Sequence, residues 1–253
     1  MSSSRAVGVA LTAVAVSVAL GSGYLVHLKR SVSKQTTCTT VTHFPRLEKA
    51  NKSDTPKISE SYLPQSPLTL PAEVASSHVL SHEQVFSKPI DLSSVHLPED
   101  ETLTAYLRGT MVAFSSTPQA YMIRSMVSAE EKQTFDKSYI DSLNFVNGDI
   151  VNGVYRVCYR GPRASAKECV ELMLDPSPAY RGPAVKGMIC AVMDVVNNGP
   201  GNGGGKIVFV NETLMWRRPE EKATMLEGGL GRWLHGLLAQ WLVVKGMNEV
   251  ASM

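Results

Sequence analysis

Cysteine, aromatic side chains and clustered charge are all scarce in this sequence. Its four cysteines, Cys38, Cys158, Cys169 and Cys190, are too few and too unevenly spaced for a disulfide scaffold, and no C-x-x-C pair suggests a zinc site. Aromatic residues make up 7% of the chain, and its formal net charge is only +2, with no block of like charges. We therefore expect no nucleic-acid partner.

Common catalytic signatures are absent as well. There is no G-x-S-x-G elbow, H-E-x-x-H pair, P-loop or catalytic-cysteine signature, which argues against the common hydrolases and nucleotide enzymes. A G-x-G-x-x-G match at Gly199, Gly201 and Gly204 precedes a strand pattern instead of a helix, so we interpret it as a hairpin loop. His78 and His82 have metal-ligand spacing but no third ligand in register. No metal and no cofactor are expected.

The longest uncharged apolar run lies near the N-terminus, at residues 6–26. A helix of about 20 residues covers a hydrocarbon core roughly 30 Å thick, so this run predicts a transmembrane anchor over residues 1–30. Lys29, Arg30 and Lys34 at its end predict, by the positive-inside rule, a cytosolic C-terminal domain on a single-pass protein of the endoplasmic reticulum membrane. A cleaved signal peptide and a mitochondrial presequence stay open as alternatives.

The 253 residues have room for one ordinary domain beside this anchor. Residues 31–98 are dominated by Ser, Thr, Pro and short polar steps without a sustained period, which predicts a flexible tether. We expect the folded domain to occupy residues 99–253. Its first helix begins near Glu99, and Thr117-Pro118 fits the N-cap and first position of a second helix.

Beyond about residue 143 the apolar period changes to that of strands. A hairpin with one solvent-exposed and one buried face is expected. A register with Cys158 opposite Cys169 would also place Arg156 opposite Glu171. Such a register permits a disulfide without requiring one. Two more strand patterns and a long helix follow. We predict an α+β fold, a two-layer domain with an antiparallel sheet of about four strands and a long C-terminal helix, as in helix-grip and cystatin-like scaffolds.

Polar residues in strands that should be buried are the best candidates for chemistry. Glu212 shares a strand face with Val210 and Leu214, and a carboxylate among such neighbours would be prepared as a general acid or base. The alternative is that Glu212 faces solvent or pairs with a nearby arginine. Tyr155 and Tyr159 are the other candidate catalytic groups of the sheet.

The end of the chain contributes the remaining candidates. Trp216 and Arg217 at a strand end could clamp an anionic or carbonyl ligand, although such a pair is more often solvated. His235 is a catalytic candidate on the C-terminal helix, where a lone histidine is more often half-buried and satisfied. Trp233 and Trp241 of the same helix are available for a ligand, a partner or the membrane surface.

The run GRWLHGLLAQWLVVKG, which contains these two tryptophans, is too short to be a second membrane span. Its uncharged core, residues 233–244, would be only about 18 Å long as a helix. A wide apolar stripe predicts a helix laid across the sheet, and this interpretation is favoured over a ligand-binding or membrane-surface role.

Residues 143–250 resemble a group of fungal proteins built as a short N-terminal span plus one small domain. The likeness is carried by FVNETLMWRRPEEKATMLEGGLGRWLHGLLAQWLVVKG and by NGDIVNGVYRVCYRG upstream. Some of these proteins resemble membrane-bound accessory proteins of gene clusters for polyketide–peptide natural products, including decalin-fused, macrocyclic pyrrolidinones. The resemblance implies a role beside other membrane-bound biosynthetic enzymes.

Two functions are therefore expected as alternatives. The first is a membrane-anchored accessory or cyclase-like protein that acts on a hydrophobic intermediate of fungal secondary metabolism, mainly by shape and a few polar groups. The second is a non-catalytic membrane scaffold or lipid-binding module. A hydrophobic small molecule is the expected ligand of either one.

Overall fold

The computed structural model describes residues 23–44, 66–163, 166–197 and 205–253. In this part of the chain the strands form one antiparallel sheet of eight, in the order β1-β2-β8-β7-β6-β5-β4, with β3 also paired to β8. The strands are β1 (Thr36–His43), β2 (Val79–Ser87), β3 (Ile90–Asp91), β4 (Ile150–Val151), β5 (Tyr155–Arg163), β6 (Ala166–Leu174), β7 (Lys186–Asn197) and β8 (Gly205–Arg217). The helices are α2 (Ala72–Ser77), α3 (Glu99–Ser115), α4 (Pro118–Met126), α5 (Lys137–Ser142) and α6 (Gly229–Ser252), with 3-10 turns η2 (Leu92–Ser94) and η3 (Glu131–Phe135).

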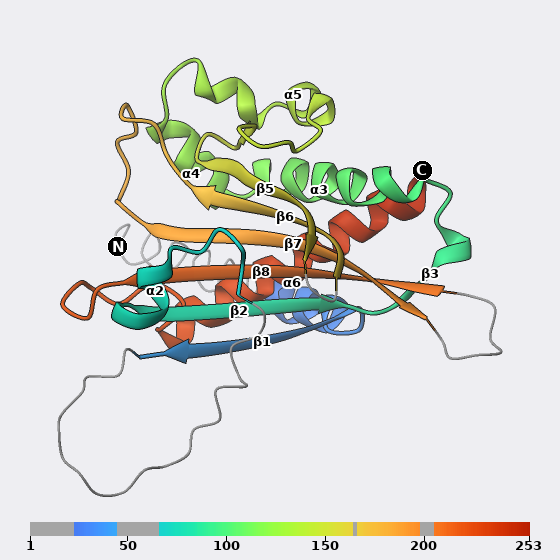
Figure 1. The fold of residues 1–253 in the computed structure, drawn as a ribbon, viewed down its shortest axis with the longest axis horizontal. Coiled ribbons are helices and arrows are strands. Elements are labelled where there is room, and N and C mark those ends of the chain that lie inside the picture. The colour runs from blue at the N-terminus through green and yellow to red at the C-terminus, as the bar shows by residue number, and fades with distance from the viewer. Residues whose placement is uncertain (1–22, 45–65, 164–165, 198–204) are drawn as a thin grey trace, which may run out of the picture.

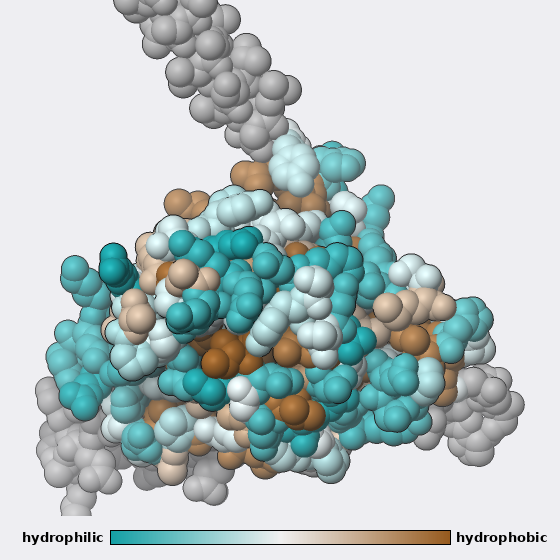
Figure 2. Space-filling view, turned by 90° about the horizontal axis from the view of Figure 1, so that it is seen from above, coloured by the Kyte–Doolittle hydropathy of each residue, from teal (hydrophilic) through white to brown (hydrophobic). Residues whose placement is uncertain are grey.

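The sheet separates two layers of packing (Figure 1). The long helices α3 and α6 lie against one face, where Ile207 and Phe209 of β8 join the larger core. The short helix α2 lies against the other face, where Val74 packs with Val210 and Leu214 of β8. Successive side chains of a strand point to opposite faces, so β8 contributes to both cores. From the side of α4 and α5, the surface is mostly hydrophilic, with hydrophobic residues in small separate areas (Figure 2).

The helices α3 and α6 cross at a close approach that requires a glycine. A Cβ atom at Gly246 would lie 2.5 Å from the Thr110 hydroxyl and 2.6 Å from the ring of Tyr106. Tyr106 is fully buried and stacks on Phe209 with a centroid distance of 4.2 Å. Its hydroxyl donates to Asn211 Oδ1 at 2.9 Å. This contact joins both long helices to the centre of the sheet.

The expected α+β class, the first two helices and the long C-terminal helix are confirmed. α3 begins at Glu99, and α4 begins at Pro118 with Thr117 as its N-cap, whose hydroxyl accepts from the amide of Ala120 at 3.2 Å. α6 is a core helix with buried residues such as Leu237 and Val243.

Replacing Thr117 by alanine is expected to lower the free energy of unfolding by about 1 kcal/mol, because the first turn of α4 loses its side-chain acceptor. Urea unfolding followed by circular dichroism measures this change. The neighbouring exposed Ser116 provides a control, and its replacement by alanine should change the free energy by less than about 0.5 kcal/mol. Equal effects at the two positions would contradict the capping role.

The prediction of a flexible tether over residues 31–98 is wrong for the residues that the structure describes. β1, β2 and β3 belong to this segment, and together with the two-residue strand β4 they bring the sheet to eight strands instead of about four. β1 is rich in threonine, which suits a strand. β2 conceals its period because polar residues such as His82 and Glu83 are buried in it. Residues 45–65 of the predicted tether lie outside the described residues.

A helical segment at 23–32 precedes β1 and packs against the outer side of α6. Val32 is buried with Leu237 and Val244, and Lys29 Nζ donates to Gln240 Oε1 at 2.9 Å. The apolar run predicted as a membrane anchor lies mostly in residues 1–22, outside the described residues. Within the described ranges, no helix combines the length and the apolar character that crossing a bilayer requires.

The predicted register of the β5–β6 hairpin is wrong. Gly161, not Cys158, lies opposite Cys169, and Arg156 lies opposite Met173, because the pairing shifts at an irregularity within β5. All four cysteines, which lie within the described residues, are free thiols. The hairpin face that carries Glu171, which was expected to face solvent, is covered by other parts of the chain. Glu171 is fully buried there, and its carboxylate accepts backbone hydrogen bonds from the segment before α2.

The strands β7 and β8 form the second hairpin that the sequence predicts. Residues 198–204, which contain the glycine-rich match, lie outside the described residues. Among the described residues, no group of three or more His, Cys, Asp or Glu side chains could hold a metal ion. His82 is a buried strand residue, whereas His78 precedes the strand, so the two histidines do not share a helical turn.

Candidate functional site

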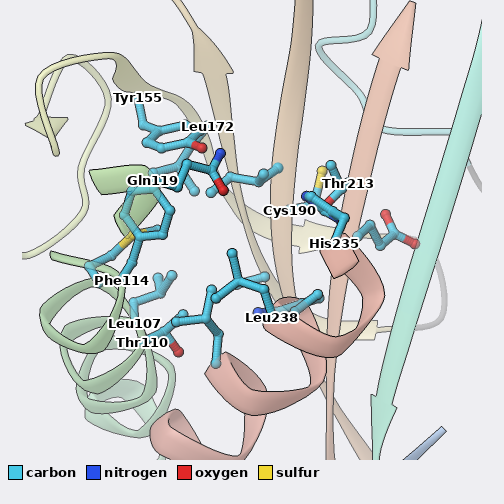
Figure 3. A pocket seen from close by; sticks show the side chains of 17 residues that line it. Leu107, Thr110, Phe114, Gln119, Tyr155, Leu172, Cys190, Thr213, His235 and Leu238 are labelled. Carbon is cyan, nitrogen blue, oxygen red and sulfur yellow. The ribbon is translucent and has the colours of Figure 1, made fainter. Parts of the chain in front are cut away.

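An inner cavity lies between the sheet and the helices α3 and α6 (Figure 3). Its volume is about 70 Å³. The wall is mostly apolar, and the main apolar residues are Leu107, Met111, Phe114, Leu172, Ala191, Leu238, Ala239 and Leu242. The structure thus leaves a small, partly open space where the sheet meets these helices.

An outer cleft of about 250 Å³ continues this space toward the surface. The inner cavity and the outer cleft share Gln119, Tyr155, Ile189, Thr213 and His235 as wall residues. Met122, Val185 and Met225 also border the cleft, and each exposes more than a third of its surface. Methionine is flexible and polarisable, so such a rim can adapt to apolar molecules of different shape. We call the two spaces together the sheet–helix cavity.

Four side chains supply hydrogen-bonding groups where the inner cavity meets the outer cleft. Gln119 lies beside Tyr155 at one side of the cavity, and His235 lies near Thr213 at the other (Figure 3). Burial raises the pKa of Tyr155 to about 12, so its phenol stays protonated at neutral pH and can donate a hydrogen bond. The wall therefore offers both donors and acceptors to a polar group of a ligand.

His235 is held by a buried carboxylate. Its Nδ1 lies 2.7 Å from Oε1 of Glu83, which is 1% exposed, on the neighbouring strand β2. The next residue of α6 is Gly236, where a Cβ atom would lie 3.3 Å from Oε2 of Glu83 and 3.3 Å from the sulfur of Cys38. The glycine lets α6 approach β1 and β2 closely enough for this pair to form.

The nearby thiol is not an activated nucleophile. Burial, together with the charge of Glu83, raises the pKa of Cys38 to about 11. A thiol acts as a nucleophile through its thiolate, which is scarce at neutral pH when the pKa is this high. The arrangement of Cys38, Glu83 and His235 therefore does not support covalent chemistry at the cysteine.

Glu212 lies in a separate polar cluster, on the α2 side of the sheet. Its Oε2 accepts from Arg163 Nη1 at 2.7 Å and its Oε1 accepts from Gln84 Nε2 at 2.8 Å. His82 Nε2 lies 3.8 Å from Oε1 of Glu212. Arg163 and Glu212 are both buried, with 5% of each side chain exposed. The alternative that Glu212 pairs with an arginine is therefore confirmed.

This cluster keeps its histidine neutral. Burial lowers the pKa of His82, while Glu212 opposes this shift and Arg163 adds to it. With His82 neutral, the positive charge of Arg163 and the negative charge of Glu212 cancel within the cluster. Glu212 also borders the inner cavity, but its carboxylate is bound to partners on the other side of the sheet. The structure does not bring Glu212 together with Tyr155 or His235 as a catalytic group.

The remaining predicted site residues of the sheet lie elsewhere. The hydroxyl of Tyr159 donates to the carbonyl of Pro162 at 2.6 Å, within its own strand. Trp216 is buried in the core on the α2 side. Arg217 donates two hydrogen bonds to the carboxylate of Glu227, at 2.9 and 2.7 Å. These contacts give Trp216 and Arg217 structural roles, and no clamp for a ligand forms between them.

The two tryptophans of α6 also lie outside the sheet–helix cavity. Trp233 is 42% exposed near the start of the helix, while Trp241 packs against the buried cluster of Val32, Leu237 and Val244. Lys245 Nζ lies 5.5 Å from the centroid of the Trp241 ring. Of the candidate residues, the structure therefore brings together only Tyr155 and His235.

Sequence reasoning missed Glu83, Gln119 and Thr213. Glu83 belongs to the segment interpreted as a tether, and the only available signal was its place between the apolar residues Leu80 and Val85. No protein-family model, curated protein or solved structure matches this chain.

Proposed function

We propose that the domain binds a hydrophobic small molecule in the sheet–helix cavity and fixes its conformation. The observation that carries this proposal is an apolar space between two layers of the fold that has few hydrogen-bonding groups and opens through an apolar rim. Small-molecule sites share these properties and begin at roughly 300 Å³, which is about the size of the inner cavity and outer cleft combined.

Two other hollows of the described surface support this proposal less well. One is lined by charged residues such as Asp100, Glu101 and Arg108, and the other is a groove between the outer sides of α3 and α6 with Lys137 and Glu249 in its wall. Both have larger volumes, but their charged walls suit water better than an apolar ligand.

The proposal agrees with a cyclase-like or accessory role on a hydrophobic biosynthetic intermediate at a membrane. Restriction of a flexible substrate accelerates ring closure without a nucleophile, which fits a site with no activated thiol. The alternative, a non-catalytic scaffold or lipid-binding module, would use the same cavity. Metabolite profiles of a host that lacks this protein separate the two, because only the biosynthetic role requires a changed profile.

Replacing Leu238 by tryptophan is expected to weaken the binding of an apolar ligand about tenfold or more, because the larger side chain fills the inner cavity. The probe is methyl decanoate, a neutral apolar ester. The measurement is the ester retained by the full chain in lipid nanodiscs, with empty nanodiscs as background.

Leu234 provides the matched control, because it lies on the same helix with 43% of its surface exposed and does not border the cavity. Leu234→Trp should leave retention within about twofold of the unmodified protein. Equal retention by both variants and the unmodified protein, with unchanged circular dichroism, would contradict binding in this cavity. Retention no higher than that of empty nanodiscs would contradict the proposed function itself.

A further inference from the structure

We propose that the ligand is an apolar acid and that it binds as its anion, having transferred its proton to Nε2 of His235. The acid can be a carboxylic acid or an enol of a dicarbonyl group, since both present an oxygen-bound acidic proton. This inference rests on the proposed function, because it concerns the head group of the molecule in the same cavity.

The tautomer of His235 follows from its partner. Nδ1 lies 2.7 Å from a carboxylate oxygen of Glu83, so Nδ1 carries the hydrogen in that contact. The nitrogen left for a ligand is Nε2, which in the neutral ring is an acceptor with a lone pair. His235 borders both the inner cavity and the outer cleft, and 14% of its side chain is exposed. The ring is therefore accessible from the space that the ligand would occupy.

The charges around His235 favour a ligand anion in the cavity only after the ligand has given its proton to the His235 ring. From β2 the ring faces the Glu83 carboxylate, which is buried and negative. From β1 it has the Cys38 thiol nearby, and the Tyr155 phenol of β5 lies across the cavity; both are neutral because burial raises the pKa of each. Lys29 of the 23–32 segment bonds to Gln240, and its charge also acts on Cys38, but it forms no ion pair with Glu83. A ligand carboxylate beside a neutral His235 would thus meet the charge of Glu83 without a cation between them.

Proton transfer removes this conflict. The O–H bond of the ligand acid breaks, its electron pair stays on the ligand oxygen, and the proton forms a bond to Nε2. His235 becomes an imidazolium that lies between two anions, Glu83 at Nδ1 and the ligand at Nε2. The Tyr155 phenol and the Gln119 amide lie across the cavity from His235 and can bond another polar group of the ligand. Release of the ligand as the neutral acid reverses the same step.

Glu83 is a positioning residue in this scheme. It fixes the orientation of the imidazole and balances the positive charge after the transfer. Thr40 Oγ1 lies 3.5 Å from its other oxygen, Oε2, so His235 is the closer partner of the buried carboxylate. This explains why a fully buried acid occupies the middle of β2.

The test compares decanoic acid with methyl decanoate on the full chain in nanodiscs, with ¹⁵N-labelled histidine rings. In a buffer where the two His235 nitrogens of the free protein show neutral-imidazole shifts, saturation with decanoic acid should move them to the imidazolium shifts. Methyl decanoate should bind and leave the ring neutral. The affinity for the acid should fall about tenfold for each unit of rising pH, because binding takes up one proton there.

Two variants make the assignment specific. His235→Gln should identify the His235 signals by their loss and remove the pH dependence of acid binding. Glu83→Gln should abolish the imidazolium shifts with the acid. Circular dichroism of each variant reports its fold. If a variant does not fold, the acid–ester comparison on the unmodified protein decides by itself.

Every outcome bears on one of the two proposals. Binding of neither probe contradicts the proposed function. Binding of both probes with His235 neutral in each case, or imidazolium shifts with the ester as well, overturns the proton transfer and leaves the proposed function standing. Acid-specific protonation with the pH dependence described above supports both.

Discussion

Replacing Glu212 by alanine is expected to lower the free energy of unfolding by about 3–5 kcal/mol, because a buried ion pair loses one partner. Arg163 and Glu212 lie 2.7 Å apart with 5% of each side chain exposed, so the arginine charge would stay in the interior without this carboxylate. Gln84 also loses its acceptor. Urea unfolding of the full chain, followed by circular dichroism, measures the effect.

The control is an ion pair of the same type on the surface. Arg156 and Asp175 lie 2.6 Å apart but are 42% and 54% exposed, so Asp175→Ala should cost no more than about 1 kcal/mol. Replacing Arg163 and Glu212 together by methionine should recover much of the stability, because no single charge is then left buried. A cost for Glu212→Ala no larger than that of the control would contradict the buried pair.

Gly246→Leu is expected to destabilise the domain by roughly 3 kcal/mol, because even the first side-chain atom has no room. A Cβ atom there would lie 2.6 Å from the ring of Tyr106. Either α6 moves away from α3, or Tyr106 leaves its place on Phe209 and its bond to Asn211. Thermal unfolding should show a marked fall in the midpoint temperature.

Gly229 provides the control for this substitution. It is the first residue of the same helix and is exposed, and no atom lies within 4 Å of the position its Cβ would take. Gly229→Leu should leave stability unchanged or slightly higher, since leucine is the better helix former. If both variants unfold at the same temperature, the close approach of α3 and α6 does not limit the residue at 246.

The sequence predicts the elements whose pattern is local. Thr117 and Pro118 mark a helix start in any context, and the apolar positions of α6 repeat with a helical period. The β5–β6 hairpin was expected as well, but its register depends on an irregularity between Val157 and Tyr159 that alternation does not reveal.

The first strands were missed for a different reason. In β2 the residues Ser81, His82 and Glu83 are buried in succession, so the usual alternation of polar and apolar residues is absent. Their partners are distant in sequence: Glu83 contacts His235, and His82 lies near Glu212. Only tertiary structure reveals such pairs.

The candidate site was predictable in part. The alternation in β8 places Glu212 on an apolar strand face, but it leaves open whether the residue is buried and cannot say which face of the sheet the long helices cover. The sequence offers Tyr155 and His235 as isolated polar candidates, and the fold places both at the sheet–helix cavity. The carboxylate that gives His235 its tautomer lies 152 residues earlier in the chain, beyond the reach of any local motif.

The short connection between the 23–32 segment and β1 has a mechanical consequence. Only residues 33–35 separate this helix from the edge strand of the sheet, and Val32 is buried against α6. A force applied at Gly23 would therefore be transmitted directly to β1 and α6, because no flexible linker separates them from this helix. The domain would turn with this helix as one body. The orientation of the helix would therefore determine the direction in which the outer cleft opens.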